Sequence, residues 1–204
     1  TMHGRLRLRP DADPMPMQAE QVLAPPHGLV WRARAGPWWM RIRGFDRYGH
    51  GRGAMRWWLY GLIPVVQADG PDVSRSAAGR VGGEAVFVPA MLLPQNGASW
   101  EAVDDDTARV TVQVDREAVT STLTVDDAGR LQRVRLPRWR DDRGDGTPGY
   151  DRFVVDHFDR ERTVDGVTIP TRFRAGWRLG EPDAFPFFEA TITTARYRPP
   201  SAAS

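Results

Sequence analysis

The sequence predicts a mainly β fold, built as a single curved antiparallel sheet or half-barrel of about ten strands with a short helical insert on its concave side. Three observations lead to this prediction. Apolar and polar residues alternate with period two along most of the chain. Short turns rich in Gly and Asp separate the alternating segments, and one stretch near the middle breaks the alternation. A sheet with this many strands must curl, split into two or close into a barrel.

The chain of 204 residues is expected to form one domain over residues 1–204, with a core over residues 28–197 and a frayed tail over residues 199–204. Apolar residues make up 41% of it, including 8 Trp and 8 Phe, which excludes a disordered protein. No change in composition marks a domain boundary, and no repeat occurs at a spacing of 20–50 residues.

The alternation places strands at residues 29–34, 38–48, 55–60, 110–114, 119–125, 131–136, 150–162, 167–179 and 187–197. Asp165-Gly166 is the clearest hairpin signal, because this dipeptide readily adopts positive φ. Residues 83–93 are expected to form a short helix, or two half-helices divided near Pro89. A second helical turn is expected at residues 20–23.

The charge and the cysteine content of the chain exclude several classes of function. All 28 basic residues are Arg, and they alternate with 26 acidic residues, which indicates a salt-bridged surface and no nucleic-acid partner. The absence of Cys excludes disulfides and thiolate chemistry, and the four His lack metal-ligand spacing, so we expect no metal and no cofactor. No apolar run is long enough for a membrane span.

The N-terminal residues Thr1–Arg5 lack the apolar segment of a signal peptide, which favours the cytoplasm for the sequence given. A Thr before Met2 indicates that upstream sequence has been trimmed, so a targeting segment can be missing. The compartment of the full-length protein therefore stays open.

Catalytic candidates are few. There is no G-x-S-x-G motif for a serine hydrolase. Asp46 and Glu84 lie in apolar surroundings, where a carboxylate either acts as an acid or base or pairs with an Arg. Glu84 stands near the start of the expected helix, where a negative charge is favoured. Tyr48 is a further candidate for proton transfer.

Two short motifs also have a plain structural interpretation. The segment Gly49–Gly53 is typical of a turn that needs positive φ, and the alternative is a backbone-amide nest for an anion beside Arg47 and Arg52. The run Asp141–Gly146 resembles a calcium loop but lacks a Glu at the twelfth position, which favours a solvated hairpin loop.

The aromatic residues carry the most information about function. Trp38-Trp39 and Trp57-Trp58 are adjacent pairs in expected strands, so each pair places one indole on either face of the sheet. One member of each pair can fill the core, and the other needs cover from the insert, a partner or a ligand. Three interpretations follow: a core packed on both sides, a concave ligand surface, and stacking of single-stranded nucleic acid on these Trp residues beside Arg.

On the second interpretation, the expected ligand-binding residues are those of two strands and the insert. The sheet contributes Trp38, Met40, Trp57 and Leu59, and the lid contributes Phe87, Val88, Met91 and Leu92. Arg41 and Arg43 are available for an anionic head group only if they face the rim.

Several motifs in order resemble the bacterial DUF6544 (DUF6920-like) family of uncharacterised proteins, over residues 28–197. The matching segments are residues 29–31, 45–51, 83–84 and 88–93, Trp100, residues 127–129 and 166–170, and Trp177. The family has no established activity, so the resemblance implies no catalytic residues. Its strands around a helical insert are also similar to half-barrels of the LolA/LolB type, which implies a carrier of lipid or acylated ligands by fold analogy alone.

We therefore expect a non-enzymatic binding protein for a hydrophobic or amphipathic, lipid-like small molecule, present as a monomer or weak homodimer. One alternative is an enzyme that uses Asp46, Tyr48 or Glu84 in the same cavity. The other is a structural or partner-binding domain whose exposed Trp residues are covered in an oligomer.

Overall fold

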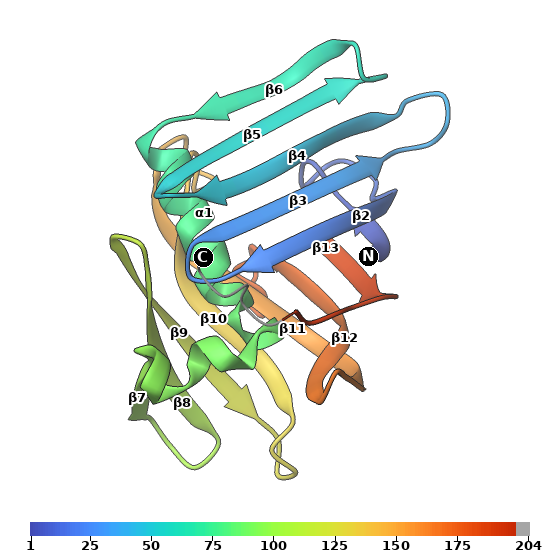
Figure 1. Cartoon of the computed structure of the whole chain (residues 1–204). Helices are drawn as coiled ribbons and strands as arrows, with labels where there is room; N and C mark the ends of the chain where they lie inside the picture. The colour runs from blue at the N-terminus through green and yellow to red at the C-terminus, as the bar shows by residue number, and fades with distance from the viewer. Residues whose placement is uncertain (199–204) are drawn as a thin grey trace, which may run out of the picture.

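The computed structural model describes residues 1–198 as one open antiparallel sheet with one α-helix (Figure 1). The thirteen strands are β1 (Met2–Leu6), β2 (Met15–Ala24), β3 (Gly28–Ala35), β4 (Ile42–Gly49), β5 (Arg52–Leu59), β6 (Ile63–Asp69), β7 (Ser99–Ala102), β8 (Thr107–Val114), β9 (Glu117–Val125), β10 (Leu131–Arg140), β11 (Gly149–Val164), β12 (Val167–Trp177) and β13 (Phe185–Ile192). The prediction of a mainly β, antiparallel sheet is confirmed, but the count of about ten strands is wrong. The expected frayed tail lies outside the described residues.

The strands lie in the order β6-β5-β4-β3-β2-β1-β13-β12-β11-β10-β9-β8-β7. The pairing of β1 with β13 brings the first and last strands together in the middle of the sheet. On either side the sheet curves, so that β2–β6 and β8–β11 form two facing limbs (Figure 1). The two edge strands, β6 and β7, do not pair with each other.

The alternation of apolar and polar residues does not predict four of the strands, β1, β2, β6 and β7. Residues 20–23, expected as a helical turn, belong to β2, where Met17 and Ala19 are buried and Glu20 is exposed. Several polar side chains hide the period-two pattern there. The strand expected from Trp38 begins only at Ile42, and Trp38, Trp39 and Met40 lie in the connection before it.

The pair Trp57-Trp58 does face opposite ways. Trp57 is buried against Trp31, with ring centroids 5.6 Å apart, whereas Trp58 packs on Phe45 on the other face. The hairpin at Asp165-Gly166 is confirmed as well, because both residues have positive φ (50° and 83°) between β11 and β12.

The helix α1 (Pro71–Gly83) precedes the segment in which a helix was expected. Residues 84–96 form three 3-10 turns, η1 (Glu84–Phe87), η2 (Pro89–Leu92) and η3 (Pro94–Asn96). The first two, divided near Pro89, correspond to the two half-helices that the sequence offered as one alternative, although they are 3-10 turns. Pro89 and Pro94 each begin a new turn, because proline cannot continue a preceding helix. Pro71 starts α1 at a position where its missing N–H costs nothing.

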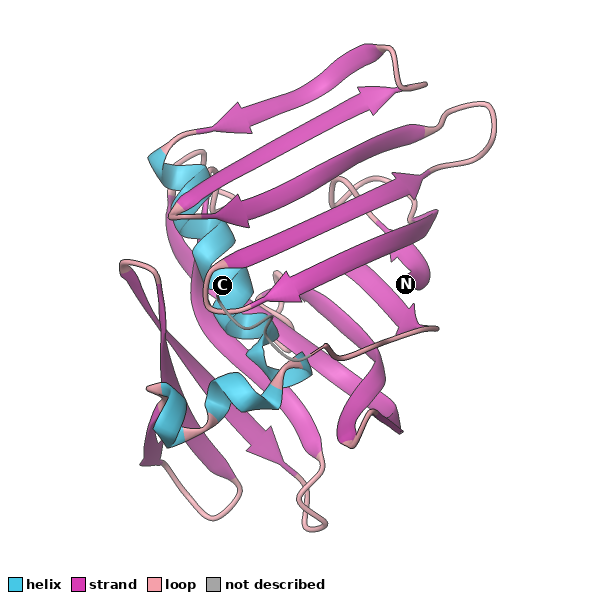
Figure 2. Cartoon of the chain, viewed as in Figure 1, coloured by secondary structure: helices cyan, strands magenta, loops and turns pink. Residues whose placement is uncertain are grey.

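Figure 2 shows α1 inside the curved sheet, between the two limbs. It packs on β5 at one end and on β9 and β10 along its length. A Cβ at Gly82 would lie 2.5 Å from Cγ1 of Val119, and one at Gly53 would lie 2.7 Å from the carbonyl oxygen of Val73. Glycine at these two positions therefore lets the helix approach both limbs closely.

None of the helices within residues 1–198 has both the length and the apolar character needed to cross a membrane.

Candidate functional site

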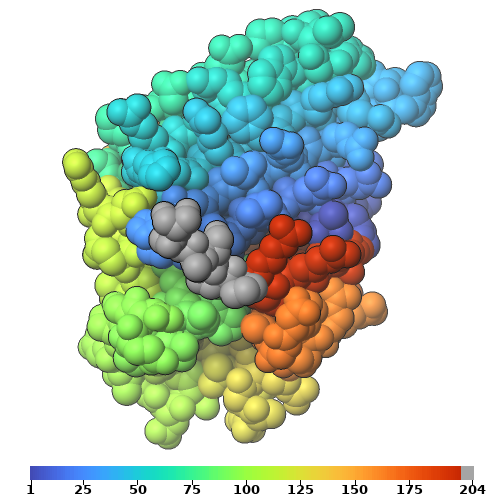
Figure 3. Space-filling view, in the orientation of Figure 1, coloured from blue at the N-terminus to red at the C-terminus, as the bar shows by residue number. Residues whose placement is uncertain are grey.

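A cavity of about 1340 Å³ lies between α1 and the concave face of the middle of the sheet. Its wall is mainly apolar and rich in aromatic rings. The principal rings are Trp31, Trp57, Phe153, Phe173, Trp177 and Phe188. In the space-filling view the strand β2, the 3-10 turns and the C-terminal part of the chain meet around the centre of one face (Figure 3). Residues 194–198 contribute to the cavity wall.

The rings of the wall contact one another across several strands. Trp31 lies 6.0 Å from Phe188 between ring centroids, and Phe173 lies 5.1 Å from Phe87 of η1. Phe153 packs edge-on against Trp177 at 5.3 Å. These residues come from β3, β11, β12 and β13, whose inward positions follow the period of two.

Three of the eight predicted ligand-binding residues, Trp57, Phe87 and Val88, line this cavity. Trp38 is 82% exposed and Met40 is 41% exposed, both in the β3–β4 connection and outside the cavity wall. Leu59 and Met91 also lie off the wall, although Met91 is buried in η2.

The remaining predicted residues divide in the same way. Leu92 does not line the cavity, and Arg41 and Arg43 are exposed beside the β3–β4 connection, away from the cavity wall. The later start of β4 accounts for Trp38, Met40 and Arg41, since residues 38–41 do not belong to a strand.

A polar cluster stands in the apolar wall around Arg80 of α1. Its Nε donates to Glu84 at 2.7 Å and its Nη1 donates to Asp46 at 3.1 Å. Gln21 closes the cluster, because its amide nitrogen donates to Glu84 at 2.6 Å and its amide oxygen accepts from Arg80 at 3.2 Å. The Trp57 indole donates to Asp46 at 3.0 Å. We call these four residues, Arg80, Asp46, Glu84 and Gln21, the Arg80 cluster.

The Arg80 cluster is balanced around its cation. Burial lowers the pKa of Arg80, but the charges of Glu84 and Asp46 outweigh it and raise the pKa above its ordinary value. Both carboxylates are therefore ion-paired, which is the structural alternative considered for them. Glu84 follows the last residue of α1 and is the first residue of η1, so the helix start expected near it is the start of a 3-10 turn.

Tyr48 does not belong to the Arg80 cluster. It is buried on β4 but does not line the cavity. Burial, followed by its hydrogen bond with Asp115, raises the pKa of the Tyr48 hydroxyl above its usual range. Asp115 also accepts a hydrogen bond from the Gly51 N–H at 2.9 Å and contacts His27 Nδ1 at 3.1 Å, so it joins three turns of the two limbs.

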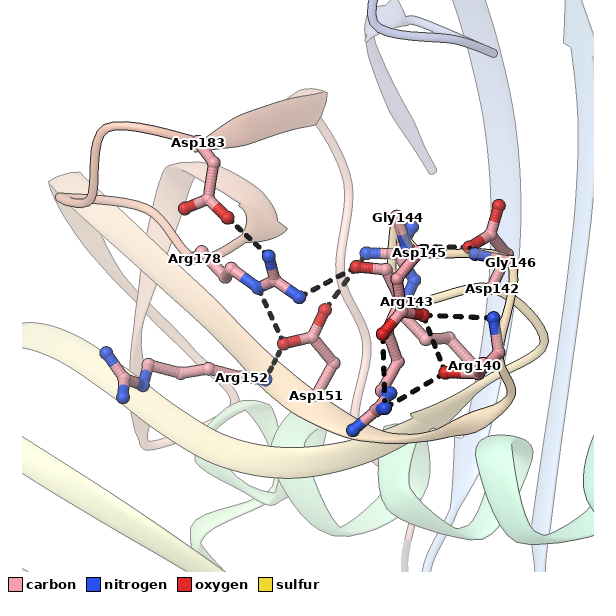
Figure 4. A network of polar contacts seen from close by, with 11 residues as sticks. Arg140, Asp142, Arg143, Gly144, Asp145, Gly146, Asp151, Arg152, Arg178 and Asp183 are labelled. Carbon is pink, nitrogen blue, oxygen red and sulfur yellow. Dashed lines mark hydrogen bonds and ion pairs between the residues drawn. The ribbon is translucent and has the colours of Figure 1, made fainter.

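The segment after β10 takes part in a second charged cluster (Figure 4), of which only Arg140 lines the cavity. At its centre, Asp151 accepts hydrogen bonds from Arg178 Nε at 2.9 Å and Arg140 Nη1 at 3.1 Å. Arg178 also donates to the carbonyl of Arg143 at 2.7 Å and pairs with Asp183. We call this group, Asp151 with Arg140, Arg143, Arg178 and Asp183, the Asp151 cluster.

The run Asp141–Gly146 is organised by its own backbone. Asp142 accepts hydrogen bonds from the N–H groups of Gly144 at 2.7 Å and Gly146 at 2.8 Å. The segment is therefore a hairpin loop in which backbone N–H groups satisfy the Asp142 carboxylate. In the part of the chain that the structure describes, no three His, Asp or Glu side chains gather in a way that could hold a metal ion.

Sequence reasoning did not single out Arg80 and Arg138, two arginines of the cavity wall. Arg138 lies on β10, two residues after the buried Leu136 and four after the buried Val134. Side chains two residues apart on a strand share a face, so Arg138 points to the concave side. That alternation was the available signal.

Comparison with known families gives one result. The model of a family of unknown function, DUF6544, matches residues 1–190. No curated protein and no solved structure matches the chain. The similarity to half-barrels of the LolA/LolB type accordingly has no structural neighbour behind it.

Proposed function

The chain belongs to the DUF6544 family, whose function is unknown, and we propose that it binds a hydrophobic or amphipathic, lipid-like small molecule in the cavity beside α1, without chemical conversion. The observation that carries this proposal is the size of the cavity together with the apolar character of its wall.

The cavity is large for a protein of this length. Small-molecule sites usually occupy about 300–1,000 Å³, and this cavity has about 1340 Å³. Protein interiors are otherwise close-packed, because unfilled apolar space forfeits contacts on every surrounding side chain. A large cavity walled by aromatic rings favours an apolar occupant over water.

The polar groups of the wall are few and mostly satisfied by one another. In the Arg80 cluster both carboxylates accept hydrogen bonds from Arg80, and the amide of Gln21 is engaged at both its atoms. Asp46 and Glu84 are thus held as structural ion pairs. This arrangement favours binding over the acid–base enzyme that the sequence also suggested.

The direct test is mass spectrometry of the purified protein, first in its native state and then after solvent extraction. We expect a lipid-like species bound at one molecule per chain. Met55→Trp, on the cavity wall, should reduce the bound fraction because the larger side chain occupies part of the space. Val30→Trp, on a residue outside that wall, is the matched control and should leave it unchanged.

The proposal fails if the wild-type protein carries nothing and also takes up no long-chain alcohol or fatty acid when these are added. In that case the packed-core interpretation of the aromatic residues would stand. Equal retention by both tryptophan variants would place any bound molecule elsewhere on the protein.

A further inference from the structure

Arg138 is a cation of the cavity wall that makes no ion pair with a carboxylate within residues 1–198. Its Nε donates to the backbone carbonyl of Ser76 at 3.0 Å, which ties β10 to α1. Its guanidinium lies over the rings of Phe153, at 4.9 Å from the centroid, and Trp177, at 5.9 Å. The side chain is therefore held in place by a helix on one side and two aromatic rings on the other.

The two neighbouring arginines of the wall are differently placed. Arg80 has Glu84 and Asp46, and Arg140, which stacks on Trp177 at 4.6 Å, is paired with Asp151. Within residues 1–198, Arg138 makes no ion pair, and the Ser76 carbonyl is its only hydrogen-bond acceptor. Its two terminal nitrogens are left without a protein partner in that range.

A cation in this position is electrostatically costly. Burial, and then the charge of Arg80, lower the pKa of Arg138 to about 10, and the attraction of Glu84 and Asp46 only partly offsets them. Those carboxylates already accept hydrogen bonds from Arg80. At neutral pH Arg138 is still charged, so an oxyanion that reached its terminal nitrogens would gain a charge-assisted, two-pronged hydrogen bond.

The fold makes room for this side chain. Gly79 of α1 lies directly over it, and a Cβ at Gly79 would come within 3.3 Å of Cγ of Arg138. A larger residue at this helix position would therefore press on the arginine stem. Helix, backbone carbonyl and rings together hold the guanidinium ready at the wall of the cavity, which lowers the entropy cost of binding an anion.

We propose that Arg138 binds the anionic head group, a carboxylate or a phosphate ester, of an amphipathic ligand whose apolar tail lies along the aromatic wall. This inference rests on the proposed function and adds to it the chemical class of the ligand and the residue that recognises it. The same arginine would orient the ligand, because it fixes which end of the molecule lies beside β10 and α1.

The test compares head groups on one tail. Dodecanoate, dodecyl phosphate and dodecanol are titrated into the wild-type protein below their micelle concentrations, with calorimetry as the readout. Acetate and inorganic phosphate serve as head groups without a tail. We expect at least one of the two anionic amphipaths to bind about tenfold or more tightly than dodecanol, and the tailless anions to bind far more weakly.

Each alternative result has a distinct meaning. Equal affinity for the anions and dodecanol would overturn the role of Arg138 and leave the proposed function intact. Binding of inorganic phosphate as tight as that of dodecyl phosphate would also overturn the inference, because the site would then recognise a free anion. Absence of binding by all three amphipaths would refute the proposed function itself.

Substitution then assigns the preference to one residue. Arg138→Met should remove the preference for anions while dodecanol still binds, and Arg138→Lys should keep part of it, since lysine retains charge without the planar fork. Arg135→Met is the matched control, because Arg135 is exposed on the opposite face of the same strand. An unchanged preference in Arg138→Met would overturn the proposal. If Arg138→Met does not fold, Arg138→Lys still tests the role of Arg138, and a wild-type protein without a preference for anions would overturn that role.

Discussion

The Arg80 cluster and the Asp151 cluster both consist of arginines and carboxylates, but the charge at the centre is positive in the first and negative in the second. One cation lies between two carboxylates in the first, and one carboxylate lies between two arginines in the second. The first joins α1 to β2 and β4 at the cavity wall, whereas the second joins β11 to the ends of β10 and β12 and reaches that wall only through Arg140 (Figure 4). The difference indicates that the first cluster secures the helix within the sheet and the second secures a loop.

The largest effect is expected for Arg80→Met. The substitution leaves Asp46 and Glu84 without their cation in a largely buried site, which should lower the free energy of unfolding by about 3–5 kcal/mol. Urea denaturation measures this loss. Addition of Asp46→Asn and Glu84→Gln to the variant should recover part of it, because no uncompensated charge then remains. A loss smaller than that of Asp151→Asn would contradict the assignment of the Arg80 cluster as the support of the helix.

A smaller effect, about 1–3 kcal/mol at pH 7, is expected for Asp151→Asn. Burial raises the pKa of Asp151, but hydrogen bonds from Arg178, the Arg152 N–H and Arg140, with the charge of Arg178, lower it below its ordinary value. A carboxylate with a lowered pKa stabilises the fold above its unfolded pKa, near about 4, and loses that contribution as the pH falls through the folded value.

The stability difference between wild type and Asp151→Asn should therefore shrink below about pH 4. Denaturation curves across pH 7 to 3 give the comparison. A difference that stays constant through this range would show that Asp151 acts through packing alone. Ligand binding should be retained in this variant, in contrast with Arg138→Met.

The smallest effect is expected for Asp142→Ala, in the loop beside the Asp151 cluster. Hydrogen bonds from the N–H groups of Gly144 and Gly146 lower the pKa of this exposed carboxylate, so its role is confined to the shape of the loop. The melting temperature should fall less than in Asp151→Asn, and ligand affinity should not change. A larger fall would mean that the loop supports the sheet more than its exposure suggests.

Sequence alone could predict those parts of the fold whose signal is local. The hairpin at Asp165-Gly166 depends on two residues that tolerate positive φ, and the inward position of Trp57 depends only on alternation. The helix α1 was missed because Gly79, Gly82 and Gly83 lower its intrinsic helix propensity. Those same glycines are needed for its close packing, a tertiary requirement that no local pattern displays.

The candidate site was predictable only in part for a similar reason. Arg138 is one of 28 basic residues, all Arg, and nothing nearby in the sequence marks it as one that faces a cavity and makes no ion pair within residues 1–198. Its isolation depends on which partners Arg80 and Arg140 take, and those partners come from β4, the end of α1 and β11. Asp46 and Glu84 could be named as a pair of interest, but the cation between them could not.

The placement of α1 between the two limbs also sets the distance between them. Because the edge strands β6 and β7 do not pair with each other, the sheet does not close into a ring of hydrogen bonds that would determine how strongly it curves. The helix acts as a spacer, and its thirteen residues measure about 20 Å at about 1.5 Å per residue. One helical turn added or removed would change this spacer by about 5 Å and leave every strand pairing intact. The calibre of the cavity can thus be retuned by helix length, independently of the sheet.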